Sequence, residues 1–450
     1  MFASLFIKSK RMKKIVVSLV AGCLFTAPTQ AQAPKVKFEK YTLPNGLKVI
    51  LHQDKSAPVV AVTVLYHVGS KNEDTGRTGF AHFFEHLLFE GSENVKRGEF
   101  DKYIKTAGGM SNANTSQDRT FYHEVLPSNQ FKLGLWLESE RMLHAKIEDI
   151  GVNTQREVVK EEKRQRIDNQ PYASWMGETF KRAFKQHPYK WLPIGSMDHL
   201  NQAQLSEFIA FYKKFYVPNN CVLSIAGDID IAEAKKQIDN YFSSIPAGKS
   251  SIQRPNIVEP PLGGEVRDVI EDNIQLPLLV HAYRTPKQGT EEYYAFNVLS
   301  TLLSGGQSAR MQKILVNQKQ VAVQAFAFPF ALEDAGLFIN LALPNMGTTV
   351  DDLEKSMDSI VNDLKENLVS DREFQKVKNQ IESEFVQKNS SVAGIAESLA
   401  DYETYFGDAN LINTEIEKFR KVTKEDIRNL AKKYFTKDNR VVLTYVPKKK

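Results

Sequence analysis

The residue types best suited to catalysis occur together in the segment His82-Phe83-Phe84-Glu85-His86. On an α-helix, side chains four positions apart lie on one face, about one turn from each other, so His82 and His86 can present two imidazoles to one metal ion. Glu85 lies close to that face and can stand beside a metal-bound water rather than bind the metal. Zinc lowers the pKa of such a water toward about 7, and a neighbouring carboxylate can then accept its proton. The segment therefore predicts a zinc centre with Glu85 as its base, against the alternative of two surface histidines on an ordinary helix.

A third ligand is predicted at Glu162, on a helix expected from about Asn153 to Arg166. Val158 and Val159 mark the inward face of this helix, and Glu162 follows them at helical spacing. A carboxylate on an apolar face needs a partner, because burial of an unpaired charge is costly. An ion pair with Arg or Lys is the alternative, but two imidazoles and one carboxylate form a common zinc set that leaves a position for water.

The other histidines have no ligand-type spacing and are predicted to be structural or exposed: His52, His67, His123, His144, His187, His199 and His281. The sequence therefore predicts one zinc ion per chain.

The amino-acid composition indicates the class of protein to which the chain belongs. The chain has 450 residues, of which 42% are hydrophobic and 25% charged, with a formal net charge of +5. This is a globular composition. No apolar run reaches the roughly 18 residues that a membrane span needs, which excludes a multi-span membrane protein.

The N-terminus is typical of a secretory signal peptide over residues 1–31. A basic cluster from Lys8 to Lys14 precedes an apolar run from Ile15 to Ala27, and small residues suited to cleavage follow, with Ala31 as the preferred site. Removal of five positive charges and no acids leaves a formal charge of zero, so the basic balance gives no reason to expect a nucleic-acid partner. We expect a secreted chain in the periplasm of a Gram-negative bacterium, without a membrane span after cleavage; lipid anchoring at Cys23 is the alternative.

Two halves are expected on either side of a segment rich in Pro, Gly and Ser. The predicted regions are a metal-binding domain at 32–244, a linker at 245–264 and a second domain at 265–450. The first half is expected to hold a β-hairpin (41–54), strands (59–68, 221–225) and helices (79–90, 153–166, 204–215); the second half is expected to hold strands (276–283, 336–343) and helices (293–303, 349–368).

The two halves are predicted to be diverged repeats. The segment 213–216, Lys-Lys-Phe-Tyr, matches Lys-Lys-Tyr-Phe at 432–435, and 86–91 matches 301–306 at nearly the same offset. At this offset, the positions of the predicted metal residues fall on Asn297, Ser300 and Thr301, which do not form a zinc set. The second half therefore repeats the predicted shape without the metal.

These motifs together resemble the insulinase/pitrilysin family of zinc peptidases, in the half-length form related to the mitochondrial processing peptidase. The resemblance runs from about Tyr41 to Val446 and is carried by the zinc helix at 79–91 in the inverzincin order, by Gly108-Gly109, Asn112-Ala113 and Asp118-Arg119-Thr120, and by 216–220 with Gly227-Asp228.

The resemblance implies an α+β fold of two homologous domains, each a mostly antiparallel sheet covered by helices. It implies a zinc endopeptidase with Glu162 as third ligand, acting on peptides or small unfolded polypeptides in a clam-like chamber. It further implies a homodimer or a heterodimer with a related subunit. By the same resemblance, substrate would add as a strand beside Asn112 and would contact Arg310.

Two positions depart from the family pattern. Gln155 stands where many relatives have a second glutamate, and Val323 stands where many have a tyrosine. A paired, non-identical subunit could supply the missing group. The alternative function is a non-catalytic, polypeptide-binding subunit, although such subunits usually lack the complete metal set found here.

Overall fold

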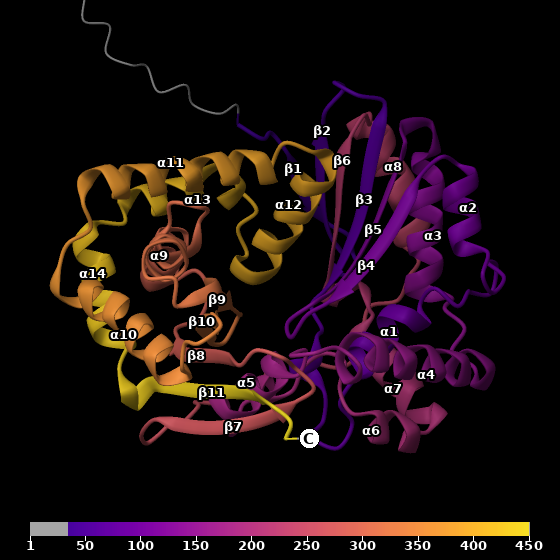
Figure 1. The fold of residues 1–450 in the computed structure, drawn as a ribbon. Coiled ribbons are helices and arrows are strands. Elements are labelled where there is room, and N and C mark those ends of the chain that lie inside the picture. The colour runs from indigo at the N-terminus through magenta and orange to yellow at the C-terminus, as the bar shows by residue number, and fades with distance from the viewer. Residues whose placement is uncertain (1–34, 450) are drawn as a thin grey trace, which may run out of the picture. The chain divides into compact units, whose positions relative to one another are not determined.

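Two β-sheets, one from each half of the chain, organise the fold (Figure 1). The computed structural model describes residues 35–449. The first sheet contains β1 (Glu39–Thr42), β2 (Lys48–Gln53), β3 (Val59–Tyr66), β4 (Met110–Thr115), β5 (Thr120–Pro127) and β6 (Cys221–Gly227). The second contains β7 (Val266–Asp272), β8 (Leu278–Thr285), β9 (Ala322–Ala331), β10 (Gly336–Pro344) and β11 (Arg440–Pro447).

The two sheets share one topology. The first has the strand order β1-β2-β6-β3-β5-β4 and the second β7-β11-β8-β10-β9. In each, one parallel pair (β2–β6, β7–β11) is followed by three antiparallel pairs. Apart from β1, the strand order of the first sheet therefore matches that of the second. This match supports the duplication predicted from the short sequence matches, and the two sheets with their helices confirm the α+β class.

The helices of the first half are α1 (Phe80–Leu87), α2 (Phe100–Thr106), α3 (Phe131–Leu143), α4 (Asp149–Lys163), α5 (Trp175–Ala183), α6 (Met197–Gln202), α7 (Leu205–Phe215) and α8 (Ile231–Phe242). Those of the second half are α9 (Glu291–Ser304), α10 (Val350–Glu366), α11 (Asp371–Lys388), α12 (Val392–Phe406), α13 (Leu411–Lys421) and α14 (Lys424–Tyr434). The predicted helices and strands are found at these places with shifted ends. The helix predicted to reach residue 90 ends at Leu87, because turns follow and Gly91 adopts a φ of 132°. Residues 245–264 contain neither helix nor strand.

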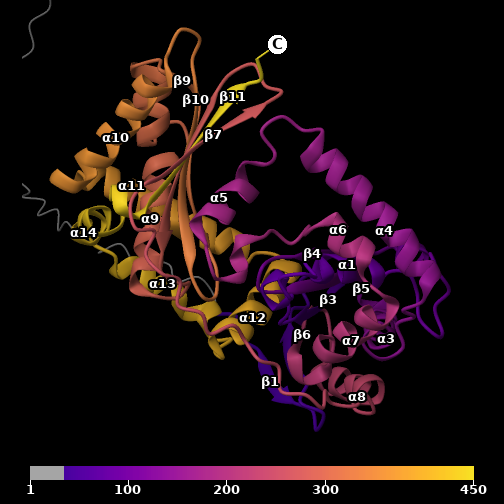
Figure 2. The same ribbon diagram turned by 90° about the horizontal axis from the view of Figure 1, so that it is seen from below.

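Alternating side chains of each sheet enter two different cores. On β3, for example, Val60, Val62 and Val64 pack with α1, α3, α7 and α8, while Ala61 and Leu65 face the other way. That second face is covered by α12, which comes from the other half of the chain. In the same manner, α5 of the first half covers one face of the second sheet (Figure 2). The halves thus exchange a helix, so each completes the other's core; the exact domain limits at 244 and 265 stay a prediction.

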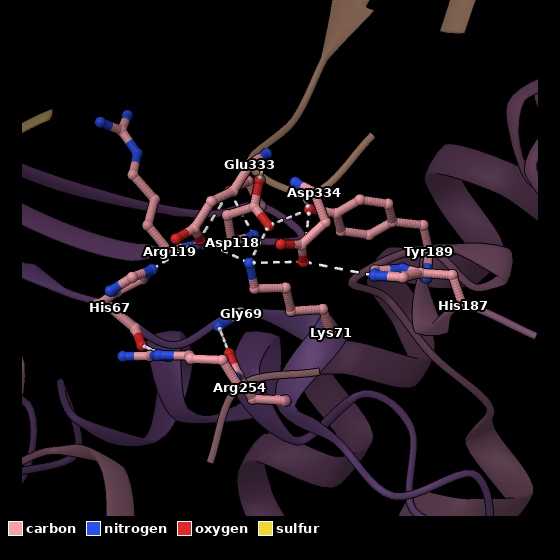
Figure 3. A network of polar contacts seen from close by, with 12 residues as sticks. His67, Gly69, Lys71, Asp118, Arg119, His187, Tyr189, Arg254, Glu333 and Asp334 are labelled. Atoms are coloured by element: carbon pink, nitrogen blue, oxygen red, sulfur yellow. Dashed lines mark hydrogen bonds and ion pairs between the residues drawn. The ribbon is translucent and has the colours of Figure 1, made fainter. Parts of the chain in front are cut away.

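A buried ion cluster joins the two halves where the β4–β5 turn meets the β9–β10 turn (Figure 3). The Lys71 ammonium, 1% exposed, lies 3.0 Å from Asp118, 2.6 Å from Glu333 and 3.1 Å from Asp334. The Tyr189 hydroxyl donates to Asp118 at 2.6 Å, and the backbone N–H of Glu333 donates to the other Asp118 oxygen at 2.9 Å. We call these five residues the junction cluster.

The predicted signal peptide and Cys23 lie outside the described residues. Within residues 35–449, no helix combines the length and the apolarity needed to cross a bilayer.

Candidate metal centre

Helix α1 presents the predicted metal residues because its other face is buried. Phe80 and Phe83 stack on Phe208 of α7, with ring centroids 4.6 and 4.8 Å apart, which leaves His82 and His86 on the opposite side. The helix begins at Gly79, whose φ of 101° and close approach to the 194–195 backbone suit glycine alone.

The first turn of α1 is held by Glu73. Its two carboxylate oxygens accept from the N–H groups of Gly79 and Ala81, each at 2.9 Å, so two donors that a helix start leaves free are satisfied. Glu73 is buried, and burial raises the pKa of its carboxyl to about 8 in spite of these hydrogen bonds. Helix α1 is therefore fixed at its start by a buried acid.

Helix α4 lies against α1 and brings Glu162 to the histidine pair. Glu162 Oε2 lies 3.0 Å from His86 Nε2 and 3.5 Å from His82 Nε2. Two atoms each about 2.1 Å from one ion, at a tetrahedral angle, are about 3.4 Å apart, so this spacing suits zinc. Within residues 35–449, these three side chains form the one group of His, Cys, Asp or Glu whose ligand atoms lie close enough to share a metal.

The surroundings of Glu162 support the same fit. Its Oε2 atom is buried and has no hydrogen-bond partner among the described residues, although it faces two ring nitrogens. The adjoining His82 and His86 rings hold the pKa of the Glu162 carboxyl well below its ordinary value, so it is an anion at neutral pH. An orphaned anionic oxygen beside two imidazoles is the donor set that zinc prefers.

A hollow of about 730 Å³ opens over this group. It is lined by the three ligand candidates, by Glu85, by residues 112–115 of β4, and by Val158, Glu161, Gln165 and Arg166. Among the residues that the structure describes, strand β4 pairs only with β5, and its other edge is unpaired beside the hollow. Val158 corrects the sequence interpretation: it is 41% exposed and faces the hollow, whereas Val159 is fully buried. The helix face that carries Glu162 therefore borders both the core and the site.

The remaining sequence-predicted residues are only partly brought together. Asn112 is exposed on β4 and lines the hollow. Gln155 lies outside its lining and donates to Glu90, three residues after the end of α1. Arg310 lies away from the lining too, between Glu373 and Asp363 of the second half at 2.8–2.9 Å. Val323 is 43% exposed on the edge strand β9.

Sequence reasoning missed Arg166, whose guanidinium contacts the second oxygen of Glu162. The signal was available, because residues four apart on a helix are neighbours and opposite charges at that spacing pair.

Comparison with known proteins decides the family. Residues 48–190 match the family model described as Insulinase (Peptidase family M16), and residues 202–381 match the one described as Peptidase M16 inactive domain. Zinc protease PqqE of Helicobacter pylori is 32% identical over 412 residues, which cover 91% of this chain and 93% of that protein. This chain belongs to the insulinase family, M16.

Solved M16 structures agree with the fold. A protease from Helicobacter pylori superposes with a TM-score of 0.87 at 31% identity, over 92% of this chain and all of the other. The periplasmic protease PqqL from Escherichia coli shares the fold with a TM-score of 0.75 at 19% identity, over 93% of this chain but 48% of its own length. The M16 fold of this chain is thus a half-length form, as the motifs predicted.

Proposed function

We propose that this chain is a zinc-dependent endopeptidase acting on peptides or small unfolded polypeptides. The observation that carries the proposal is one hollow that contains His82, His86 and Glu162 at metal-binding distances, Glu85 as an additional acid, and an unpaired strand edge. Relatives named zinc proteases support the metal and the reaction class.

Each side chain of the site would have a distinct role in the reaction. His82, His86 and Glu162 would hold zinc, which when bound supplies a Lewis acid that polarises the scissile carbonyl and acidifies a water. Glu85 lies in the same hollow, accepts a proton from the attacking water and returns it to the leaving amine.

Substrate would be positioned by β4. An extended peptide can add to an unpaired strand edge through main-chain hydrogen bonds, which select backbone conformation rather than side-chain identity. Asn112 and Asn114 point from this strand as exposed side chains at the hollow and would contact the substrate side chains. This arrangement favours unfolded substrates, because a folded protein rarely offers a free extended segment.

We propose that the working form is a pair of M16 units that enclose a chamber, either two copies of this chain or this chain with a related subunit. The PqqL fold neighbour has about twice the length that this chain covers, which supports a two-unit arrangement. Arg310 is already paired with two carboxylates within its own chain, so a partner would have to supply any additional substrate contacts. The signal peptide predicted at residues 1–31 supports a periplasmic location.

A non-catalytic, polypeptide-binding subunit is the second candidate. The match of residues 202–381 to a model described as an inactive domain favours it. That match begins at residue 202, however, after all three metal residues, and the complete set lies within the other match, residues 48–190.

The test compares Glu85→Gln with the wild-type mature chain, using a quenched fluorogenic peptide and metal analysis. We expect the variant to keep zinc and to lose about 10²–10⁴-fold in rate, the usual contribution of a general base. Glu157→Gln is the matched control, since Glu157 lies on α4, is 69% exposed and is outside the hollow. Wild-type cleavage should stop with a chelator and return with zinc. Full activity of Glu85→Gln would refute the mechanism, and zinc binding without cleavage by the wild type would favour the non-catalytic subunit.

A further inference from the structure

The two carboxylate oxygens of Glu162 have different surroundings. Oε2 is buried and faces the two imidazoles, whereas Oε1 accepts from Arg166 Nη1 at 2.5 Å. One oxygen is therefore free for a metal and the other is already occupied. Outer-shell partners of this kind orient metal ligands and are as much a part of the site as the ligands themselves.

We propose that Arg166 is a positioning residue of the metal centre: by holding Oε1 of Glu162, it keeps Oε2 directed at the ion between His82 and His86. The inference rests on the proposed zinc site and deepens it, since it adds a residue that does not touch the metal.

The contact spans the end of α4 and the turn that follows it. Arg166 lies in η3 (Arg164–Asp168), a π-helical turn that follows α4 without a break and ends at Asn169. Such turns are rare and occur often at functional sites. Here the turn places Arg166 at the rim of the hollow, four residues after the ligand.

Charge pairing within this turn is selective. Arg164 pairs with Glu161, and Lys163 pairs with Asp168. Arg166 pairs with Glu162 alone among the described residues, and its side chain is 77% exposed while that of Glu162 is 13% exposed. Ion pairs with one partner in water add little to fold stability. Loss of Arg166 should therefore affect the metal and leave the fold unchanged.

Two physical effects oppose each other at this position. A cation near the site repels a metal ion, so its removal could tighten binding. Without Arg166, however, the Glu162 carboxylate can rotate, and zinc binding must then restrict that rotation, which weakens the binding. Loss of an outer-shell partner typically costs about 10–100-fold in metal affinity. Because the guanidinium is exposed and screened by water, we expect the orienting effect to exceed the repulsion.

The experiment measures the zinc dissociation constant of the metal-free chain by competition with a chromophoric chelator. We expect Arg166→Ala to bind zinc about tenfold or more weakly than wild type, with an unchanged thermal midpoint of the metal-free protein. Arg166→Lys keeps a donor and the charge and should recover most of the lost affinity. Arg164→Ala is the matched control, because Arg164 lies in the same turn, is 57% exposed and pairs with Glu161, which is not a ligand candidate.

The outcomes that decide this inference are read from zinc affinity, without a peptidase assay. Zinc affinity of Arg166→Ala within twofold of wild type, or tighter, overturns this inference alone. An equal loss in Arg164→Ala also overturns it, because the effect would then come from the turn as a whole. A wild-type chain that binds no zinc overturns the metal site and the proposed function with it, whereas a wild-type chain that binds zinc but cleaves nothing overturns only the proposed function.

Discussion

Replacement of Lys71 by methionine should destabilise the protein far more than a surface charge substitution. Lys71 is 1% exposed and contacts three carboxylates, of which Asp118 is 4% exposed. Methionine is similar in length and fills the space, so the cost is mainly electrostatic: three negative groups remain without their cation. Breaking a buried ion pair in this way costs about 3–5 kcal/mol, which lowers the ratio of folded to unfolded protein by roughly 150- to 5,000-fold.

Urea unfolding of the metal-free chain, followed by circular dichroism, measures this cost. Lys235→Met is the control, because Lys235 is 44% exposed and pairs with a 53% exposed Glu39, so its loss should cost less than about 1 kcal/mol. Adding Glu333→Gln to Lys71→Met should recover part of the stability, since it removes one of the repelling charges. A cost below about 1 kcal/mol for Lys71→Met would refute the reasoning, because it would mean that water or a rearranged turn replaces the cation.

The same variant should change the response to acid. Burial raises the pKa of Asp334, but the neighbouring His187 ring and the Lys71 ammonium outweigh it and lower the pKa to about 2. A carboxyl with a folded-state pKa below its ordinary 3.8 adds stability above that pH and loses it as the pH falls toward 2. Without Lys71, this acid-dependent loss should become smaller, which urea titrations at several pH values between 2 and 5 would show.

Two further predictions concern the metal helix. Glu162→Gln should weaken zinc binding by more than roughly 100-fold, since it removes an anionic ligand rather than an outer-shell partner; unchanged zinc content after dialysis would contradict the assignment. Burial raises the pKa of Glu73 from 4.5 to about 8, so the stability that this acid contributes is fully present below pH 4.5 and is lost as the pH rises to 8. Glu73→Gln should therefore flatten the stability profile over that range, and an identical slope in urea titrations of both proteins would contradict the shift.

Sequence patterns were sufficient to predict those parts of the structure that depend on the types and spacing of neighbouring residues. Strand β3 is a run of β-branched and apolar residues buried on both faces, and the turn at Pro44-Asn45-Gly46 closes the β1–β2 hairpin with Gly46 at a φ of 87°. The histidine pair needed only helical spacing. Glu162 was found because a charge on a partly apolar face needs a partner, although Val158 proved to border the hollow rather than the core. Helix periodicity alone could not show whether Val158 lies in the core or at the open site, because valine is suited to both surroundings.

The contacts between the two halves could not be predicted from local sequence patterns. Nothing in the sequence of α5 or α12 says that each covers the other half's sheet, because an amphipathic helix specifies an apolar partner but not which one. The junction cluster joins Lys71 to residues more than 260 positions later in the chain, and each member alone is an ordinary charged residue. The exchange of helices and the cluster have a common consequence: neither half buries its core without the other. The second half is therefore linked through the fold to the start of α1, because Lys71 is held by its β9–β10 turn and lies two residues before Glu73, which caps that helix.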